Sequence, residues 1–294
     1  MKLYAPAYYK DFACIANRCR HSCCIGWEID IDEKTDAKYA DVGGEIGEAI
    51  RSSIERSETP HFVLADGERC PHLLDSGLCR IIKTLGEGYL CDICRSHPRF
   101  YNFAPTKSEV GLGIACEEAC RLALTSDKCR EFICIGEDSV EPCKMDFDAI
   151  AERESLYAVL FEKDVPYSER LEKIYEVYGV SPKNMGDDEW RELISSFEYL
   201  NESHRELFCA YSSEVSDENA EILARALAYF VFRHCTEAED IEEYRASLGF
   251  CLFCERLLAS LARAGADVFD AARVISEELE YSEDNTEAVR SMFL

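Results

Sequence analysis

The sequence predicts a mainly α protein in which a loop-rich, cysteine-cluster N-terminal region packs on a helical C-terminal domain. Six of the eight prolines precede residue 145, and ten of the 15 glycines precede Gly136, so turns concentrate in the first half. Ten of the 17 cysteines lie between Cys14 and Cys120, whereas the end of the chain has apolar residues at helical spacing. We therefore divide the chain into a cysteine-rich domain, 1–145, and an α-helical domain, 146–294.

Amphipathic patterns place most of the helices in the second half. Helices are expected over 152–161, 168–178, 187–199 and 266–281. The segment 220–234 has a wider apolar stripe, made by Ile222, Leu223, Ala226, Leu227, Phe230 and Val231. A helix with so wide an apolar surface is expected at the centre of its domain. Short strands are expected at two places, 28–31 and 109–115.

A further helical stripe is made by Phe250, Phe253, Cys254, Leu257, Leu258 and Leu261. Cys251 and Cys254 have the CxxC spacing of metal or redox sites. However, Cys254 lies on this stripe and no second cysteine pair accompanies it. We therefore predict that both are ordinary buried thiols, and we interpret Cys209 and Cys235 in the same way.

The charge balance is strongly acidic, with 32 Lys and Arg against 58 Asp and Glu and a net charge of −26 near pH 7. A field of this sign repels phosphate backbones, so nucleic acid is excluded as the main partner. The longest apolar stretch, 224–232, is far shorter than the roughly 20 residues that span a membrane, and the first residues lack a secretory signal pattern. We expect a cytoplasmic protein with no membrane partner, whose thiols stay reduced.

The N-terminal cysteines form three dense groups, Cys14-x4-Cys19-x3-Cys23-Cys24, Cys70 with Cys79, and Cys91-x2-Cys94. Clustered thiols in a reducing compartment favour metal or cluster ligation over disulfides. Two cysteine pairs would suffice for a zinc site, whereas eight thiols exceed it and also suit a [4Fe–4S] cluster. We favour the cluster, with zinc and unligated thiols as alternatives. The predicted metal ligands are Cys14, Cys19, Cys23, Cys24, Cys70, Cys79, Cys91 and Cys94.

The same residues carry a family resemblance. The opening motif is Phe12-Ala-Cys14-Ile…Cys19-Arg-His-Ser-Cys23-Cys24-Ile-Gly-Trp27, followed by Cys70-Pro-His-Leu-Leu, Gly77-Leu-Cys79-Arg-Ile, Leu90-Cys91-Asp-Ile-Cys94-Arg-Ser-His-Pro98-Arg99 and Ala115-Cys116-Glu-Glu-Ala. Two weaker motifs are Ala228-Tyr-Phe-Val-Phe-Arg233-His and Glu277-Glu-Leu-Glu-Tyr-Ser-Glu-Asp-Asn285. In this order the motifs resemble the flagellin lysine-N-methylases, within a wider group of CxxCxxCC-type iron- or zinc-chelating cluster proteins.

The resemblance implies an enzyme of the bacterial flagellum that transfers methyl groups from S-adenosylmethionine to surface lysines of flagellin and contains a cysteine-ligated iron–sulfur cluster. Cys19-x3-Cys23 begins the CxxxCxxC motif of radical S-adenosylmethionine enzymes, but position 26 is glycine, so that motif is incomplete. The alternative is a non-catalytic iron–sulfur or zinc binding protein for electron transfer, storage or sensing. The helices beyond the cysteine region favour the enzyme.

Individual catalytic residues are harder to assign, because the motifs of the common hydrolase and nucleotide-binding classes are absent. Glu87 and Tyr89 are candidates for orienting the substrate amine, with a role in the turn as the alternative. Trp27 is a candidate for stacking on the methyl donor, with core packing as the alternative. Arg99 and Asn102 are candidates for binding the carboxylate of the donor or for holding their loop in place.

Overall fold

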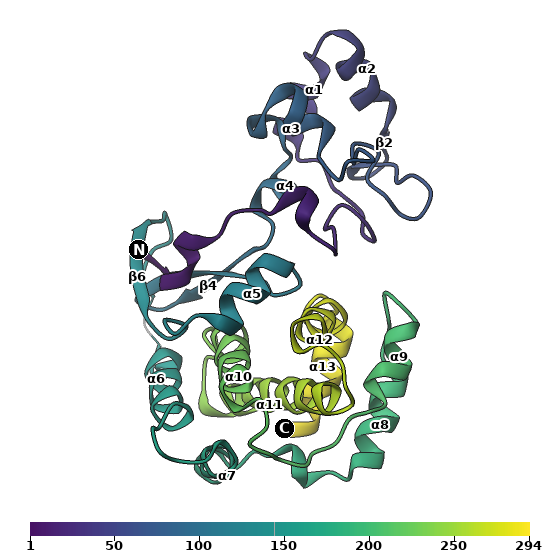
Figure 1. Cartoon of the computed structure of the whole chain (residues 1–294). Coiled ribbons are helices and arrows are strands. Elements are labelled where there is room, and N and C mark those ends of the chain that lie inside the picture. The colour runs from purple at the N-terminus through teal and green to yellow at the C-terminus, as the bar shows by residue number, and fades with distance from the viewer. Residues whose placement is uncertain (144) are drawn as a thin grey trace. The chain divides into compact units, whose positions relative to one another are not determined.

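The computed structural model describes residues 1–143 and 145–294 and confirms a mainly α chain with a small β-sheet (Figure 1). Its contacts divide the chain into two compact units. The smaller unit is Ala13–Pro98, and the larger unit combines Met1–Phe12 with Arg99–Leu294. This division differs from the one predicted at residue 145, because the strands and the helix that follow Pro98 pack with the C-terminal helices.

The smaller unit consists of short helices, one two-stranded ribbon and long loops. Its helices are α1 (Glu33–Ala40), α2 (Gly44–Ser52), α3 (Arg80–Leu85) and α4 (Asp92–Ser96), with 3-10 turns η2 (Ala16–Arg18) and η3 (Glu87–Tyr89). Strands β2 (Ile54–Arg56) and β3 (Pro60–Phe62) pair antiparallel. The core of the unit contains the buried side chains of Ile29, Ile31, Tyr39, Ile50, Phe62 and Ile81.

The strand predicted near residues 28–31 does not form. Asp30 makes one isolated bridge to His61, and two backbone hydrogen bonds tie Ile29 and Ile31 to β3. Both isoleucines are buried, so the alternation of apolar residues does report burial. Only the single bridge between Asp30 and His61 forms, so this segment is too short to count as a strand.

The larger unit contains a four-stranded sheet with the order β4-β5-β1-β6. Its strands are β1 (Lys2–Pro6), β4 (Arg99–Ala104), β5 (Lys107–Leu112) and β6 (Phe132–Glu137), and a 3-10 turn, η1 (Ala7–Asp11), follows β1. β1 pairs parallel with β5 and antiparallel with β6. The strand predicted at 109–115 is confirmed as β5, with both ends nearer the N-terminus. A β-carbon at Gly111 would lie 2.2 Å from the Phe100 ring, so this glycine permits close packing.

Helices form the rest of the larger unit, and those predicted are confirmed with small shifts at their ends. They are α5 (Glu117–Thr125), α6 (Ala149–Leu160), α7 (Tyr167–Tyr178), α8 (Asp187–Ser196), α9 (Ser203–Phe208), α10 (Ala220–His234), α11 (Ile241–Arg263), α12 (Val268–Ile275) and α13 (Glu283–Arg290), with 3-10 turns η4 (Pro182–Asn184) and η6 (Ser291–Phe293). A π-turn, η5 (Ser276–Glu280), continues α12. Within residues 1–143 and 145–294, every helix is too short or too polar to cross a membrane.

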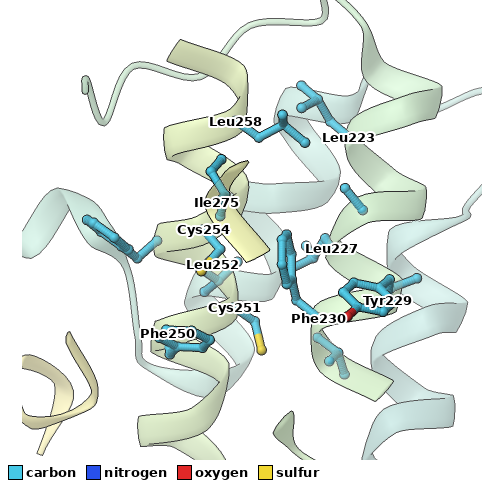
Figure 2. Close-up of a cluster of buried hydrophobic side chains, with 14 of the residues drawn as sticks. Leu223, Leu227, Tyr229, Phe230, Phe250, Cys251, Leu252, Cys254, Leu258 and Ile275 are labelled. Atoms are coloured by element: carbon cyan, nitrogen blue, oxygen red, sulfur yellow. The ribbon is translucent and has the colours of Figure 1, made fainter. Parts of the chain in front are cut away.

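α10 and α11 pack side by side and provide much of the core of the larger unit (Figure 2). Cys251 and Cys254 of α11 are fully buried there, as is Cys235. The sulfur atoms of Cys235 and Cys251 lie 3.8 Å apart. These three cysteines therefore behave as the predicted buried thiols. The prediction for Cys209 is wrong: it is exposed, because α9 ends just before it.

A buried ion pair joins the sheet to α6. Arg153 and Glu109 are 1% and 0% exposed, and the guanidinium donates to both carboxylate oxygens at 2.6 and 2.8 Å. Thr236 accepts a further hydrogen bond from Arg153, and Lys107 Nζ lies 3.1 Å from Glu109. Burial alone would raise the pKa of Glu109, but its contacts with Arg153 outweigh burial and hold that pKa below its ordinary value.

We predict that Arg153→Ala lowers the free energy of unfolding by about 3 kcal/mol, because it leaves the Glu109 carboxylate buried without its main partner. Urea denaturation followed by circular dichroism measures the change. The control is Arg121→Ala, which removes the pair between the exposed Arg121 and the partly buried Glu118 and should cost about 1 kcal/mol or less. Equal losses for the two variants would contradict the importance of the buried pair.

Candidate metal centre

Five of the eight predicted ligands gather in the core of the smaller unit. Cys70 and Cys91 are 8% and 1% exposed, and Cys24, Cys79 and Cys94 pack against the same apolar cluster. The Cys70 thiol is influenced electrostatically by Cys24, Cys79 and Cys91. The Cys94 thiol is influenced in the same way by Cys24, Cys70 and Cys91. The fold therefore brings together cysteines from all three groups in the sequence.

Local backbone geometry places these thiols. The Cys70 N–H donates to the Cys24 carbonyl at 2.8 Å, which joins the first group of cysteines to the second. A turn at Gly77, whose φ is +75°, returns the chain to Cys79. Cys79 and Cys91 are the N-cap residues of α3 and α4. Four of the five thiols thus leave the chain at a turn or a helix start, and Cys94 lies within α4.

Backbone N–H groups stabilise negative charge on three of the sulfur atoms. The donors are His72 for Cys70, Ile81 and Ile82 for Cys79, and Cys94 for Cys91. Each donor follows its cysteine by two or three residues, where the chain turns or a helix begins. Hydrogen bonds of this kind surround the thiolates that bind metal ions and iron–sulfur clusters.

The thiols differ in acidity. A hydrogen bond from the Cys23 thiol lowers the pKa of Cys24 to about 7, and burial raises the pKa of Cys70 to about 12. The Cys94 thiol donates to Cys91, which lowers the pKa of Cys91 and raises that of Cys94. Cys24 and Cys91 are therefore the more acidic members of the group.

The other three predicted ligands lie in the preceding loop. Cys14 and Cys23 are exposed, and Cys19 is half-buried. The Ala16 N–H approaches Cys14 Sγ at 3.4 Å, and Cys19 Sγ donates to the His21 carbonyl at 3.0 Å. Cys23 is connected to the buried group through its hydrogen bond to Cys24. Ligation by these three cysteines stays a prediction.

The five gathered thiols suit a soft metal centre. All five donors are sulfur, which zinc and iron–sulfur clusters both accept. Among the residues that the structure describes, however, no three Cys, His, Asp or Glu side chains are arranged so that they could already hold a metal ion. Metal binding therefore stays a prediction, and ligation would require the sulfur atoms to draw closer together.

The other candidates of the smaller unit make local contacts. The Trp27 ring packs on His97, with 5.9 Å between the ring centroids. Glu87 and Tyr89 form η3, where Glu87 is exposed. The Lys38 ammonium lies 4.2 Å from the centre of the Tyr89 ring and donates to the carbonyl between the two candidates. These contacts fit the packing and turn alternatives, while the catalytic and cofactor roles stay predictions.

Arg99 and Asn102 belong to the larger unit, on β4, whereas Trp27 belongs to the smaller one. Arg99 Nε donates to the Tyr9 hydroxyl at 2.9 Å. Asn102 is 3% exposed, and its side-chain amide donates to the Phe232 carbonyl of α10 at 2.7 Å. These bonds favour the alternative in which both residues hold β4 in place. Their binding to a methyl donor stays a prediction.

The sequence did not predict a second polar centre, in the larger unit. The Glu280 side chain is fully buried and accepts hydrogen bonds from His234 at 2.7 Å, from Tyr229 at 3.0 Å and from Ser276. Arg233 Nε lies 3.5 Å from the same carboxylate. Glu280 closes the π-turn η5, a type of turn that is frequent at functional sites. Tyr229, Arg233 and His234 belong to one of the two weaker motifs. Glu280 belongs to the other, so these motifs were the only sequence signal used here that included this centre.

Comparisons with known proteins agree with the cysteine motifs. The chain is 32% identical over 127 residues to a lysine-N-methylase of Salmonella choleraesuis and 31% identical over 127 residues to one of Salmonella typhimurium. Each match covers 38% of this chain and 30% of the relative. The chain is also 32% identical over 124 residues to the flagellar biosynthetic protein FliU of Salmonella muenchen, covering 38% of this chain and 71% of FliU.

No family model matches the chain, and no solved structure does. The match to FliU nevertheless spans most of that protein at a level of identity that indicates common descent. The chain therefore belongs to the family of FliU and the lysine-N-methylases, which confirms the resemblance seen in its motifs. It spans about 30% of the length of the two lysine-N-methylases.

We predict that Cys24 reacts with iodoacetamide far faster than Cys70 in the reduced, metal-free protein. The thiolate is the reactive form. A pKa of about 7 leaves Cys24 half ionised at neutral pH, whereas a pKa of about 12 keeps Cys70 protonated. Mass spectrometry of peptides after short pulses at a series of pH values measures both rates, with exposed Cys209 as an accessible reference. Faster labelling of Cys70 than of Cys24 would contradict the prediction.

Proposed function

We propose that this protein transfers methyl groups from S-adenosylmethionine to lysine side chains of flagellin. The observation that carries the proposal is the 32% identity with FliU over 71% of that protein, together with the name lysine-N-methylase borne by two further relatives. A flagellar protein and lysine methylases in one family favour a flagellar substrate that is methylated on lysine. The matched part is only 30% of the lysine-N-methylases, so their activity is carried over as a proposal.

The proposed reaction needs a neutral lysine amine in line with the sulfonium methyl group. The amine lone pair forms the new N–C bond as the C–S bond breaks, S-adenosylhomocysteine leaves, and the amine proton passes to water. Lysine has an ordinary pKa of about 10.4, so the site must favour the neutral amine or accept its proton. The net charge of −26 supports the approach of a lysine-bearing surface.

We further propose that Cys24, Cys70, Cys79, Cys91 and Cys94 supply the ligands of a [4Fe–4S] cluster, with zinc as the alternative. Support comes from their gathering in one apolar core and from the N–H groups that face three of the sulfur atoms. A bound cluster or zinc ion would cross-link the loops of the smaller unit. The methyl transfer described above does not pass through it.

The first expected outcome concerns activity. Incubation of the protein with flagellin and S-adenosylmethionine should produce methyl-sized mass steps on flagellin, measured by intact mass spectrometry. The matched control replaces the donor with S-adenosylhomocysteine, which has no methyl group to give. A second control uses flagellin whose lysines have been acetylated, because an acetylated amine is no longer nucleophilic. Flagellin that gains no methyl groups from the anaerobically prepared protein would overturn the proposal.

The second expected outcome concerns the metal. Anaerobically purified protein should contain iron and acid-labile sulfide and absorb visible light, whereas Cys91→Ser and Cys79→Ser should lose most of both. Cys79 is half-buried, so its variant tests ligation even if serine at buried Cys91 disturbs the fold. Cys209→Ser, at an exposed site of the larger unit, is the control that removes one thiol and should keep its iron. Zinc as the sole metal would reject the cluster in favour of the alternative.

A non-catalytic metal-binding protein is the second candidate function, and the gathering of thiols favours it independently of the relatives. The two measurements separate the candidates. Bound iron or zinc without methylation of flagellin supports the binding protein, whereas methylation supports the enzyme whatever metal is found.

A further inference from the structure

A group of tyrosines surrounds a buried ion pair in the larger unit. Tyr167 and Tyr175 belong to α7, and Tyr211 lies in the loop after α9. The ion pair is formed by Glu255 and Arg256, which are neighbours on α11 and are both 0% exposed. The three tyrosines are 1%, 6% and 0% exposed. We call these five side chains the tyrosine centre, and none of them takes part in the proposed function.

Direct hydrogen bonds use only part of the bonding capacity of the ion pair. Arg256 donates to Glu255 through Nε, at 2.5 Å, and through Nη2, and it donates to the Glu214 carbonyl through Nη1 at 2.9 Å. The Tyr167 hydroxyl donates to Glu255 Oε1 at 2.7 Å. A carboxylate has about four acceptor positions, and a guanidinium has about five N–H donors. In the described part of the chain, Glu255 thus keeps about one acceptor position and Arg256 about two N–H donors.

The other two hydroxyls of the centre, those of Tyr175 and Tyr211, have no hydrogen-bond partner among residues 1–143 and 145–294. Both hydroxyl oxygens are buried. Burial, and then the nearby Glu255 carboxylate, raise the pKa of Tyr175. Burial, and then the nearby Tyr175, raise the pKa of Tyr211. The charges of Glu255 and Arg256 influence both tyrosines, so the two hydroxyls lie near each other and near the ion pair.

Packing keeps the Tyr211 hydroxyl inside the centre. Its ring stacks on Phe253, with 5.1 Å between the ring centroids, and lies 5.8 Å from Trp190. A ring held on both sides cannot swing outward to find another partner. A buried hydroxyl that stays unpaired loses the hydrogen bonds that it makes with water in the unfolded chain, and folded proteins pair nearly all such groups. The two hydroxyls therefore call for a shared partner within the centre.

We infer that the tyrosine centre binds an internal water molecule, which joins the hydroxyls of Tyr175 and Tyr211 to the ion pair on α11. Water both donates and accepts hydrogen bonds, and a buried water makes about three of them. It can donate to the remaining acceptor position of Glu255 and can bond both hydroxyls. The water thereby links α7 and the loop after α9 to α11.

The charge balance of the centre favours a neutral ligand over an ion. Glu255 and Arg256 already cancel each other's charge, and both are fully buried. A bound cation or anion would add an unpaired charge to this interior, where charge without a partner is costly. Water satisfies the hydroxyls without that cost. The inference depends only on the packing of the larger unit, so it stands or falls separately from the proposed function.

Thermal unfolding of the full chain tests whether the two hydroxyls are bonded in solution. Tyr175→Phe and Tyr211→Phe should each lower the unfolding midpoint by about 2–4 °C, because each removes a hydrogen bond to the water. Removal of a hydroxyl that has no partner would instead raise the midpoint. The matched control is Tyr157→Phe, which removes a buried hydroxyl that donates directly to the Ala228 carbonyl at 2.6 Å and so calibrates the expected loss. An unchanged or raised midpoint in either test variant would overturn the inference.

Two further measurements test the shared water itself. The double variant Tyr175→Phe, Tyr211→Phe should lose less than the sum of the two single losses, because both hydroxyls bond the same molecule. Additive losses would contradict a shared partner. A crystal structure of the full chain should show an ordered water within about 3.2 Å of both hydroxyl oxygens. An ion in that place, or hydroxyls that bond each other or Glu255 directly without a water, would overturn the inference.

Discussion

The gathering of five cysteines in one apolar core is the constraint on which the smaller unit depends. The unit has short helices and a two-stranded ribbon, so regular secondary structure alone gives it little cohesion. Its loops instead converge on Cys24, Cys70, Cys79, Cys91 and Cys94. The sulfur atoms of Cys70, Cys79 and Cys91 accept backbone N–H groups from the turns beside them. Burial raises the pKa of Cys70 and Cys79, so these thiols would lose their protons only when a metal binds them.

The larger unit is stabilised in a different way, by buried charges that are fully paired. Glu109 joins the sheet to α6 through Arg153, and Glu280 and Glu278 hold the π-turn against its neighbours. Each carboxylate is inaccessible to water, so each needs several donors, and those donors come from segments far apart in the chain. These buried carboxylates and their donors therefore fix the relative positions of elements within the larger unit, which an apolar core alone would leave less defined.

The two features belong to different parts of one proposed enzyme. The cysteine motifs place the chain in its family, and their thiols offer a metal centre in the smaller unit. The larger unit contains a pocket lined by acidic and aromatic side chains.

The sequence by itself determined the class of fold, the family and the helices of the second half, because helical periodicity and dense cysteine motifs are local signals. It also indicated that Cys251 and Cys254 are buried rather than ligands. Only the tertiary structure decided that β1 joins strands formed after Pro98, that five thiols rather than eight share one core, and that Glu278 and Glu280 are buried with donors from distant segments. These outcomes depend on which distant segments meet, and pairings between distant segments leave no periodic trace in a single sequence.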